Sequence, residues 1–528
     1  MIRTLEGVIA RFERGLRSRA APAVFGIASA LAIYWLMGSL SPAPWVYDEA
    51  AYLLQAKIFG SGHWAVPGPP LPEFFEQLHV LVTPRLVPKY PPGHALLMVP
   101  GIWLGLPALI PLLWSGITGA LIFAFARSLA NGWVGFLTWI VWITAPVELY
   151  IRPSFMSQTS TTLLWLLAWW CLARWRGMAG GGGRGWLMAL AALMALGLIT
   201  RPITTVALGI PVLIVGLRGL ARGRAWLDLV PALVVAAPIV AIAPLWSWST
   251  IGRAYPTPYS EYSRVYTPWN LPGFTVDRSA PLRPEIPAIQ RFRSEWLPVH
   301  EAHTVRRLPR IMADRFRGIA TTFWGDSGTP GRGGWSARWV LAVAALVGLL
   351  AVPIEVRVAL WGGVALFLAM LSLASRPLWT VYYLELSPVL AFVTALGVWR
   401  VLSALANRYG RAALAPALLI VGLLVAAPGT TERLIRAHQQ QIDVRTVATE
   451  LRRAVDSIPG RAVVFVESGP AHRPYESYVL NQPDWAGARV WVVQDRGADN
   501  QRLLAVAPDR APYRFDPGSG SLRSGSTR

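Results

Sequence analysis

Two adjacent acidic residues, Asp48 and Glu49, are the strongest candidates for catalysis in this chain of 528 residues. They begin a short amphipathic segment, WVYDEAAYLLQAKIFGSG, directly after the first apolar run. A helix there would place Tyr52, Gln55 and Lys57 within about two to three turns of the acids. A carboxylate at this place can act as a general base. The pair also suits a helix N-cap whose charges offset the helix dipole, and spacing alone leaves both interpretations open.

The two lysines of the chain are a second signal at the same place. Of the 49 basic residues only Lys57 and Lys89 are lysines, and both lie in the segment 42–93 that carries the acidic pair. A compact ammonium binds phosphate as a point charge, whereas a guanidinium is planar and binds it through a fork of donors. The pattern therefore favours a phosphate-containing substrate near this segment.

Metal-binding chemistry has little support in the sequence. The seven histidines all fall in segments that we expect outside the membrane, and we expect most of them at the surface. His300 and His303 form an HxxH pair with no strong third ligand. The single cysteine, Cys171, excludes an internal disulfide framework and a cysteine-based zinc site. We expect no metal and no other cofactor.

The elements that position these residues belong to a membrane protein. Hydrophobic residues make up 54% of the chain, charged residues 15%, and the mean hydropathy is +0.42. A soluble domain carries about a quarter charged residues. The apolar residues come in runs of roughly 20, separated by short Arg-rich or Pro-rich pieces, which is typical of a multi-pass protein. The net charge of +21 falls mostly on one side of the predicted helices, which argues against a nucleic-acid partner.

The pattern predicts an all-α polytopic module over residues 21–428 with about eleven transmembrane helices. The first helix covers 21–40, and the Arg-rich segment 1–20 before it lies in the cytoplasm by the positive-inside rule. The following basic clusters alternate so that the segments 42–93 and 251–335 lie outside. The stretch 94–126 is too long for one span and predicts a short interfacial or re-entrant helix before helix two. Two short helices flank Thr200, Arg201 and Pro202.

Residues 429–528 have a different pattern, in which polar and apolar residues mix. An amphipathic helix is predicted over 439–458, and buried strands over 462–468 and 488–495, with helical signals between and after them. The last residues, GSGSLRSGSTR, are typical of a flexible tail. The sequence thus predicts a small extracytoplasmic α/β domain after the membrane module.

The segments WVYDEAAYLLQAKIFGSG and KYPPGHALLM, at their places after helix one and before helix two, resemble the GT-C superfamily of membrane glycosyltransferases. The protein O-mannosyltransferase and aminoarabinose-transferase branches are the most similar. Weaker likenesses are ELYIRPSFMSQTS, LITRPITT and WTVYYLELSPVLA, so the resemblance covers roughly residues 45–396. It implies a GT-C fold and inverting transfer of a sugar from a polyprenyl-phosphate carrier to an acceptor hydroxyl on the non-cytoplasmic side.

The resemblance also implies roles for individual residues. Asp48 matches the acidic residue of the family, which takes the proton of the acceptor hydroxyl, and Glu49 would orient the acceptor or assist. Cations must offset the negative charge of the leaving phosphate. The candidates are Lys89 first, then Arg201, Arg376 and Arg152, each of these arginines also suiting a snorkelling interfacial residue. Candidate contacts to sugar or phosphate are Tyr52, Lys57, Tyr90, His94, Glu148, Tyr382, Tyr383 and Glu385.

Two features depart from the family pattern. In the aminoarabinose-transferase branch the lysine directly precedes the prolines, whereas Tyr90 follows Lys89 here, which leaves the phosphate contact of Lys89 open. No second acidic pair follows helix three, only Glu148. Some relatives need a divalent metal there, and the sequence supports no ligand set for one, so we expect a metal-independent reaction.

A transporter or flippase of a lipid-linked or anionic substrate is the alternative. Transporters commonly show repeats and discontinuous helices with polar residues near the bilayer midplane. Here the polar residues gather at one face, which favours an enzyme. A scaffold that binds partners through its tail would not explain the segment 42–93. We expect an integral protein of a bacterial inner (plasma) membrane whose partners are a polyprenyl-phosphate sugar, a lipid, glycan or protein acceptor, and membrane lipids.

Overall fold

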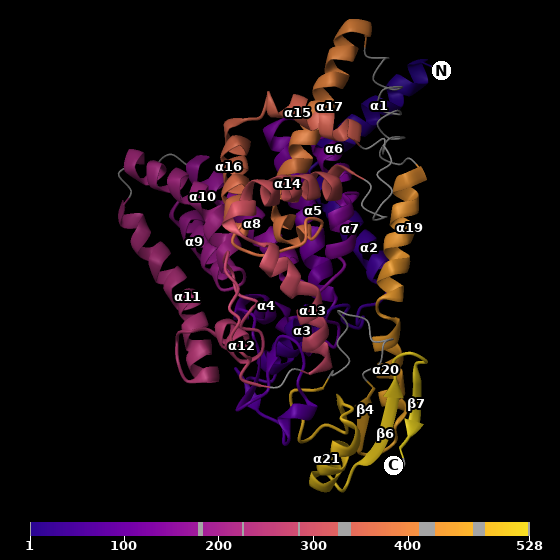
Figure 1. Cartoon of the computed structure of the whole chain (residues 1–528). Helices are drawn as coiled ribbons and strands as arrows, with labels where there is room; N and C mark the ends of the chain where they lie inside the picture. Colours follow the sequence, from indigo (N-terminus) through magenta and orange to yellow (C-terminus); the bar gives the residue numbers. More distant parts are fainter. Residues whose placement is uncertain are drawn as a thin grey trace.

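The structure is a computed structural model that describes residues 2–177, 183–223, 226–283, 286–325, 339–410, 428–467 and 481–525. Most of the described chain is helical, and the two termini lie at opposite ends of an elongated molecule (Figure 1). The described helices of the N-terminal segment and of the apolar module are α1 (Ile2–Arg17), α2 (Ala21–Met37), α4 (Pro92–Trp103), α5 (Leu109–Leu129), α6 (Gly132–Ile143), α7 (Pro146–Ile151), α8 (Ser157–Gly177), α9 (Arg184–Leu198), α10 (Pro202–Gly223), α11 (Leu229–Ile251), α15 (Trp339–Leu349), α16 (Ile354–Met370) and α17 (Ser387–Tyr409).

Four helical stretches are long and apolar enough to cross a membrane: Leu109–Leu129, Pro202–Arg222, Trp226–Ile251 and Thr380–Tyr409. Two further pairs pass the same test only together, α1 with α2 and α15 with α16, and they bend by 91° and 118° at their breaks. The described residues therefore hold four to six candidate spans, and the predicted eleven are not confirmed. Several predicted spans correspond to apolar helices shorter than a bilayer needs, such as α6 and α9. The predicted eleventh span lies in 411–427, outside the described residues.

Helix breaks in the apolar module follow the punctuation of the sequence. The stretch 94–126 divides into α4 and α5, and Thr200–Pro202 separates α9 from α10, both as predicted. Gly93 makes a close approach possible here, because its N–H donates to the Ile199 carbonyl at 2.9 Å and a Cβ would lie 2.4 Å from Thr200 Oγ1. This contact joins the PPG element to the loop that carries Arg201.

The segment 42–93 combines a helix with three very short strands. It contains α3 (Tyr47–Gly60), β1 (Val66–Pro67), the 3₁₀ turn η1 (Pro72–Phe74), β2 (Val80–Leu81) and β3 (Arg85–Pro88). The strands pair antiparallel in the order β1-β3-β2. The described part of the segment 251–335 is helical, with α12 (Pro258–Tyr266), α13 (Pro287–Ala302), η3 (Val305–Arg307) and α14 (Leu308–Trp324), and η4 (Thr380–Leu386) follows later in the chain. α12 and α13 lie near α3 in the lower half of Figure 1.

The C-terminal segment runs back along the module before it forms a sheet. α19 (Pro428–Asp443) lies beside α2, and α20 (Thr446–Ser457) leads into the sheet (Figure 1). The single helix predicted over 439–458 is wrong, because the chain breaks at Val444–Arg445. The predicted strands are confirmed as β4 (Ala462–Val466) and β5 (Val490–Gln494), and α21 (Asn500–Val506) and the strands β6 (Ala511–Asp516) and β7 (Ser521–Ser524) follow.

The sheet order is β5-β4-β6-β7, with β5, β4 and β6 parallel and β7 antiparallel. β7 falls in the stretch expected to be flexible, where a turn with Gly520 at positive φ lets Ser521–Ser524 pair with β6. Phe74 at the end of η1 and the next residue, Phe75, pack into one face of this sheet, against Val463 and Trp491. The sheet therefore shares a core with the segment 42–93.

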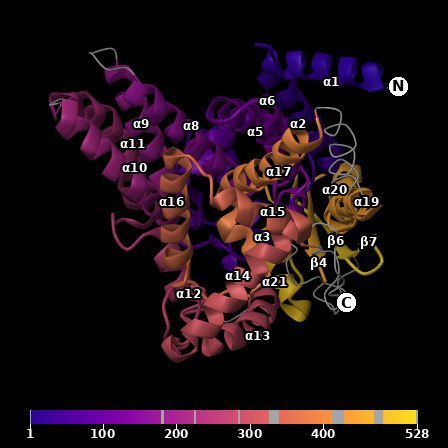
Figure 2. The same ribbon diagram turned by 90° about the horizontal axis from the view of Figure 1, so that it is seen from above.

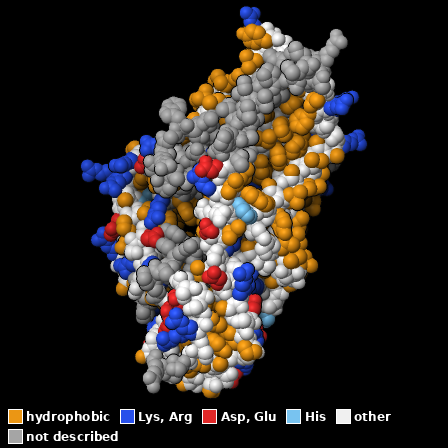
Figure 3. All heavy atoms as spheres, turned by 90° about the vertical axis from the view of Figure 1, so that its right-hand side faces the viewer, with side chains coloured by type: hydrophobic (Ala, Val, Ile, Leu, Met, Phe, Trp, Pro, Cys, Tyr) orange, Lys and Arg blue, Asp and Glu red, His pale blue; other side chains and the backbone are white. Residues whose placement is uncertain are grey.

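Seen from above, α9, α10 and α11 lie on the side of the molecule opposite to α19, α20 and the sheet (Figure 2). The face on the side of α19 and the sheet carries an extended hydrophobic patch (Figure 3). Positively and negatively charged side chains gather below this patch. Exposed large apolar side chains of α2, including Ile27 and Leu31, are of the kind that lipid covers.

Candidate active site

Asp48 lies in the first turn of α3 and faces a cluster of polar and aromatic side chains. Its Oδ1 accepts a hydrogen bond from the Tyr90 hydroxyl, and its Oδ2 lies 3.6 Å from His79 Nε2. The side chain keeps 34% of its surface exposed although protein surrounds it, so solvent reaches the carboxylate. Burial raises the pKa of this carboxyl, but its interactions with His79, Tyr90 and Lys89 outweigh burial and lower the pKa well below its ordinary value.

Glu49 faces the opposite way and has no exposed surface. Its Oε2 accepts the Trp45 N–H at 2.5 Å, and its Oε1 accepts the Phe155 N–H at 3.0 Å. It thus satisfies a backbone donor just before α3 and ties that helix start to the chain before α8. The structure separates the two interpretations of the acidic pair: Glu49 makes cap-like backbone contacts, and Asp48 faces the polar cluster.

Lys89 lies beside Asp48 inside a cage of aromatic rings. Its ammonium nitrogen is 4.6 Å from the ring centre of Tyr259, 4.9 Å from that of Tyr262 and 5.4 Å from that of Tyr90. The cage follows from β3, which ends one residue earlier, and from α12, whose i and i+3 positions supply two rings. Burial lowers the pKa of Lys89 to about 8, although the charge of Asp48 opposes the shift.

His79 closes the same cluster from the turn before β2. The residue has φ of 69°, and its carbonyl accepts the Lys89 N–H at 2.9 Å. Burial and the Lys89 charge lower the pKa of the imidazole, whereas the Asp48 carboxylate raises it. We expected most of the seven histidines at the surface, and that expectation is wrong, because His79, His94, His300 and His303 are buried.

Arg201 belongs to a second, linked set of polar side chains. Its Nε lies 3.2 Å from Glu385 Oε1, and its NH1 donates to Ser157 Oγ at 3.4 Å. The Tyr52 hydroxyl donates to the same Ser157 Oγ at 2.9 Å, and the Tyr52 ring stacks on Tyr90 with centres 4.5 Å apart. Tyr52 therefore connects the surroundings of Arg201 to those of Asp48.

His94 supports this arrangement from α4. Its Nδ1 and Nε2 lie 2.9 Å from Ser160 Oγ and 2.8 Å from the Phe155 carbonyl oxygen. Its ring packs edge-on against Tyr52 at 4.7 Å. Burial lowers its pKa to about 4, so the imidazole is neutral and holds the start of α8 in place.

Glu148 and Arg152 form a buried pair in α7. The Arg152 Nε donates to Glu148, which also accepts from the Trp142 indole at 2.9 Å and from the Ser387 hydroxyl. The Arg152 guanidinium lies 4.8 Å from the Trp142 ring and has no exposed surface. Among the described residues, NH1 and NH2 of Arg152 are buried without a hydrogen-bond partner, and the contact of Arg152 with a lipid phosphate stays a prediction.

The remaining candidates lie apart or at the edge of the cluster. Arg376 pairs with Glu295 at 3.2 Å and stacks on Trp296, and Tyr383 contacts Arg315 at 3.3 Å. Lys57 faces Arg452 and not Asp48, and burial lowers its pKa to about 8. Tyr382 is half-buried and lies within electrostatic reach of both Asp48 and Arg201. Of these residues only Tyr382 joins the cluster.

Sequence reasoning missed several residues of the cluster, namely His79, Ser157, Tyr259, Tyr262 and Arg445. The stripe of tyrosines in TPYSEYSRVY, three and four residues apart, was a signal for one aromatic helix face. Within the described ranges, no three His, Cys, Asp or Glu side chains come together as a metal site requires.

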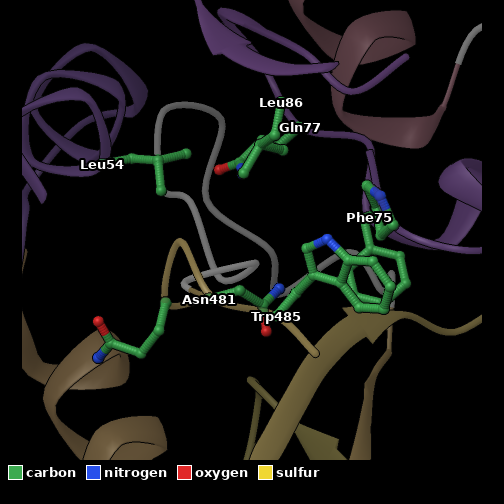
Figure 4. A pocket seen from close by; sticks show the side chains of 8 residues that line it. Leu54, Phe75, Gln77, Leu86, Asn481 and Trp485 are labelled. Atoms are coloured by element: carbon green, nitrogen blue, oxygen red, sulfur yellow. The ribbon is translucent and has the colours of Figure 1, made fainter. Parts of the chain in front are cut away.

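A pocket lies where the segment 42–93 meets the C-terminal segment. It is lined by Leu54, Phe75, Leu86 and Trp485 together with the amides of Gln77 and Asn481 (Figure 4). The Asn481 amide is engaged by the backbone of Val492, and the Trp485 indole donates to the Pro67 carbonyl at 2.9 Å. The pocket therefore belongs to the junction between the two segments.

No family model and no curated protein matches the chain. Among solved structures, ArnT from Cupriavidus metallidurans, an aminoarabinose transferase, is similar in its complex with undecaprenyl phosphate, with 16% identity over 95% of this chain and 91% of that chain, and a TM-score of 0.52. The apo form of the same protein is 15% identical over 93% of this chain and 92% of that chain, with a TM-score of 0.51. The archaeal oligosaccharyltransferase AglB from Archaeoglobus fulgidus is 13% identical over 94% of this chain and 69% of that chain, with a TM-score of 0.46.

The chain has the GT-C fold. At this level of identity the likeness to ArnT establishes the fold alone. Together with the apolar helices, it makes the chain an integral membrane protein, as the hydropathy pattern predicted. The predicted resemblance to the aminoarabinose-transferase branch of the GT-C superfamily is confirmed at the level of fold.

Proposed function

We propose that this chain is a glycosyltransferase that moves a sugar from a polyprenyl-phosphate donor to an acceptor hydroxyl, with Asp48 as the general base. One observation carries the proposal: a solvent-reached, ionised Asp48 lies beside the buried, caged ammonium of Lys89. A base and a phosphate-binding cation are the two groups that this transfer needs. ArnT, which shares the fold, was crystallised with undecaprenyl phosphate.

In the proposed reaction Asp48 takes the proton of the acceptor hydroxyl as the acceptor oxygen bonds to the anomeric carbon. The bond between that carbon and the phosphate oxygen breaks on the opposite face, so the configuration inverts and polyprenyl phosphate leaves. Asp48 Oδ1 is occupied by Tyr90, so Oδ2 is the oxygen that would receive the proton. Glu49 has no exposed surface and would act by holding the helix start.

The leaving phosphate would lie against Lys89, with Arg201 as a second cation. The ammonium of Lys89 contacts three aromatic rings, so its positive charge would be available to an anion. Arg201 is half-buried and shares its charge with Glu385, so it offers a weaker charge than Lys89 does. Tyr52 and Tyr382 each interact electrostatically with both Asp48 and Arg201, and they would contact the sugar or phosphate.

The test is transfer of radiolabel from undecaprenyl-phosphate sugars in membranes that contain the Asp48→Asn variant. Loss of a general base costs about 10²–10⁴-fold in rate. Asp456→Asn, an exposed change on α20, is the matched control. Full transfer by Asp48→Asn would exclude Asp48 as the base. Label that crosses the bilayer without forming a new glycosidic bond would instead identify a transporter. Mass spectrometry of envelope glycans and glycolipids, with and without the gene, would identify sugar and acceptor.

We also propose that the site and the C-terminal segment face the outside of a bacterial inner membrane, with the N-terminus in the cytoplasm. Cys171 is the only cysteine of the sequence and it is buried, so single introduced cysteines report their own side. In intact spheroplasts an impermeant maleimide should label Ser457→Cys on α20, and should label Arg14→Cys on α1 only after permeabilisation. The reverse pattern would invert the proposed topology.

A further inference from the structure

Arg445 reaches from the C-terminal segment into the site from a position about 400 residues away in the sequence. It lies at the break between α19 and α20, and only 4% of its surface is exposed. Its Nε donates to the Ala43 carbonyl at 2.9 Å, and its NH2 donates to the Pro153 carbonyl at 3.0 Å. These two carbonyls belong to the chain just before α3 and just before α8. One guanidinium therefore joins the two backbone segments that flank the cluster.

The same guanidinium faces Glu49. Its NH2 lies 3.9 Å from Glu49 Oε1, the oxygen that accepts the Phe155 N–H. Burial of the Glu49 carboxylate away from water costs free energy. The positive charge of Arg445, which does not belong to α3, offsets part of this cost. Glu49 in turn fixes Trp45 and Phe155, and Asp48 is the next residue along the helix. The contacts form a continuous chain from α19–α20 to the proposed base.

Further contacts fix the position of α19 and α20 on the same two segments. Gln441 Nε2 donates to the Tyr150 carbonyl at 3.2 Å and its Oε1 accepts from Arg445, while Arg452 NH1 donates to the Ser41 carbonyl at 2.8 Å. The Gln494 amide donates to the Glu76 carbonyl at 3.3 Å near His79. The C-terminal segment therefore contacts backbone carbonyls at several places around the cluster.

We propose that Arg445 is a positioning residue for the transfer reaction. By holding Glu49 and the carbonyls of Ala43 and Pro153, it fixes the first turn of α3 and with it the Asp48 carboxylate. The C-terminal segment is in this way part of the catalytic unit. The expected effect of Arg445 on the transfer rate rests on the proposed function. The expected effect of Arg445 on the position of the first turn of α3 does not.

The experiment compares full-length Arg445→Met, Arg445→Lys, Glu49→Gln and the double variant Glu49→Gln/Arg445→Met in nanodiscs. Arg453→Ala, an exposed change on α20, is the control. Arg445→Met should lower kcat for transfer from an active undecaprenyl-phosphate sugar by about 10–100-fold, because a misplacement of about 1 Å costs that much. The Kd for undecaprenyl phosphate should change by less than about twofold, since Lys89 and Arg201 keep their own supports.

Two comparisons separate positioning from a general loss of structure. Arg445→Lys keeps the charge opposite Glu49, and it should restore part of kcat. The double variant should be no slower than Glu49→Gln alone, within about twofold, if Arg445 acts through Glu49. Strictly multiplicative effects, or a parallel loss of kcat and of undecaprenyl phosphate binding, would overturn the inference, as would a kcat of Arg445→Met equal to that of Arg453→Ala.

Hydrogen exchange tests the effect of Arg445 on the first turn of α3 without any transfer activity. In Arg445→Met the peptides that contain the amides of Trp45 and Phe155, both donors to Glu49, should exchange at least about tenfold faster. Arg453→Ala should leave them unchanged. If no donor sugar is ever transferred, the proposed function fails, but faster exchange at these amides still supports the positioning contact. Unchanged exchange would refute it whatever the enzyme does.

Discussion

The ammonium of Lys89 makes the pH dependence of donor binding a sharp prediction. Burial lowers the pKa of Lys89 to about 8 in the free protein. Above that pH the side chain is neutral and loses its attraction for phosphate, so affinity for undecaprenyl phosphate should fall as pH rises. A phosphate monoester has its second pKa near 6, so the lipid itself changes little above about pH 7.5.

The magnitude follows from the fraction of protonated Lys89. If only the ammonium binds, the apparent Kd scales as one plus the ratio of neutral to charged lysine. With a pKa of about 8, that factor rises about eightfold between about pH 7.5 and about pH 9. Lys89→Arg should abolish this slope, because a guanidinium stays charged throughout the range. Lys89→Met should bind weakly at every pH.

The assay is quenching of tryptophan fluorescence by undecaprenyl phosphate in nanodiscs at a series of pH values. Lys57 provides the discriminating variant, because burial lowers its pKa to about 8 as well, although it faces Arg452. Lys57→Gln should keep the slope. A slope that survives in Lys89→Arg, or one that disappears in Lys57→Gln, would refute the assignment of the phosphate to Lys89.

Three further outcomes are expected. Tyr90→Phe removes a hydrogen bond that lowers the pKa of the proposed base, so the acidic limb of log kcat against pH should move to higher pH. Arg152→Met leaves the buried carboxylate of Glu148 uncompensated and should cost about 3–5 kcal/mol in unfolding experiments, most of it restored by adding Glu148→Gln; no loss of stability would contradict a structural pair. Gly397→Ala puts a methyl 1.7 Å from a backbone oxygen of α15 and should lower the melting temperature, whereas Gly216→Ala meets open space and should not.

The acidic pair shows how far sequence reasoning reached into the site. The predicted helix after the first apolar run is confirmed as Tyr47–Gly60, whereas the catalytic roles of Asp48 and Glu49 stay predictions. The sequence could not distinguish the surroundings of the two side chains, because both occupy a first helical turn and both suit a cap. What separates them is the direction of each side chain, which depends on the backbone N–H of Phe155, more than 100 residues later.

The missed residues share a physical cause. His79 owes its burial and its position beside Asp48 to a left-handed backbone turn between two-residue strands, and pairing that short leaves no periodic pattern. In the sequence, Arg445 looks like an exposed arginine of an amphipathic helix. The structure shows that the helix is interrupted at Arg445, between α19 and α20. By contrast, the break before α5 was predictable because the apolar stretch 94–126 is too long for one span, and a break at Thr200–Pro202 was predicted between two helices.

The aromatic cage explains how a cation and an anion lie side by side without neutralising each other. Within the described part of the chain, Lys89 and Asp48 form no direct ion pair, although each shifts the pKa of the other. The Tyr90 hydroxyl occupies one carboxylate oxygen, while the rings of Tyr259 and Tyr262 hold the ammonium through their faces. Ring faces attract a cation without donating to or accepting from it in the way a carboxylate does. In the proposed reaction Asp48 would therefore keep an oxygen for a proton and Lys89 would keep its charge for a phosphate, whereas a salt bridge between them would engage both groups.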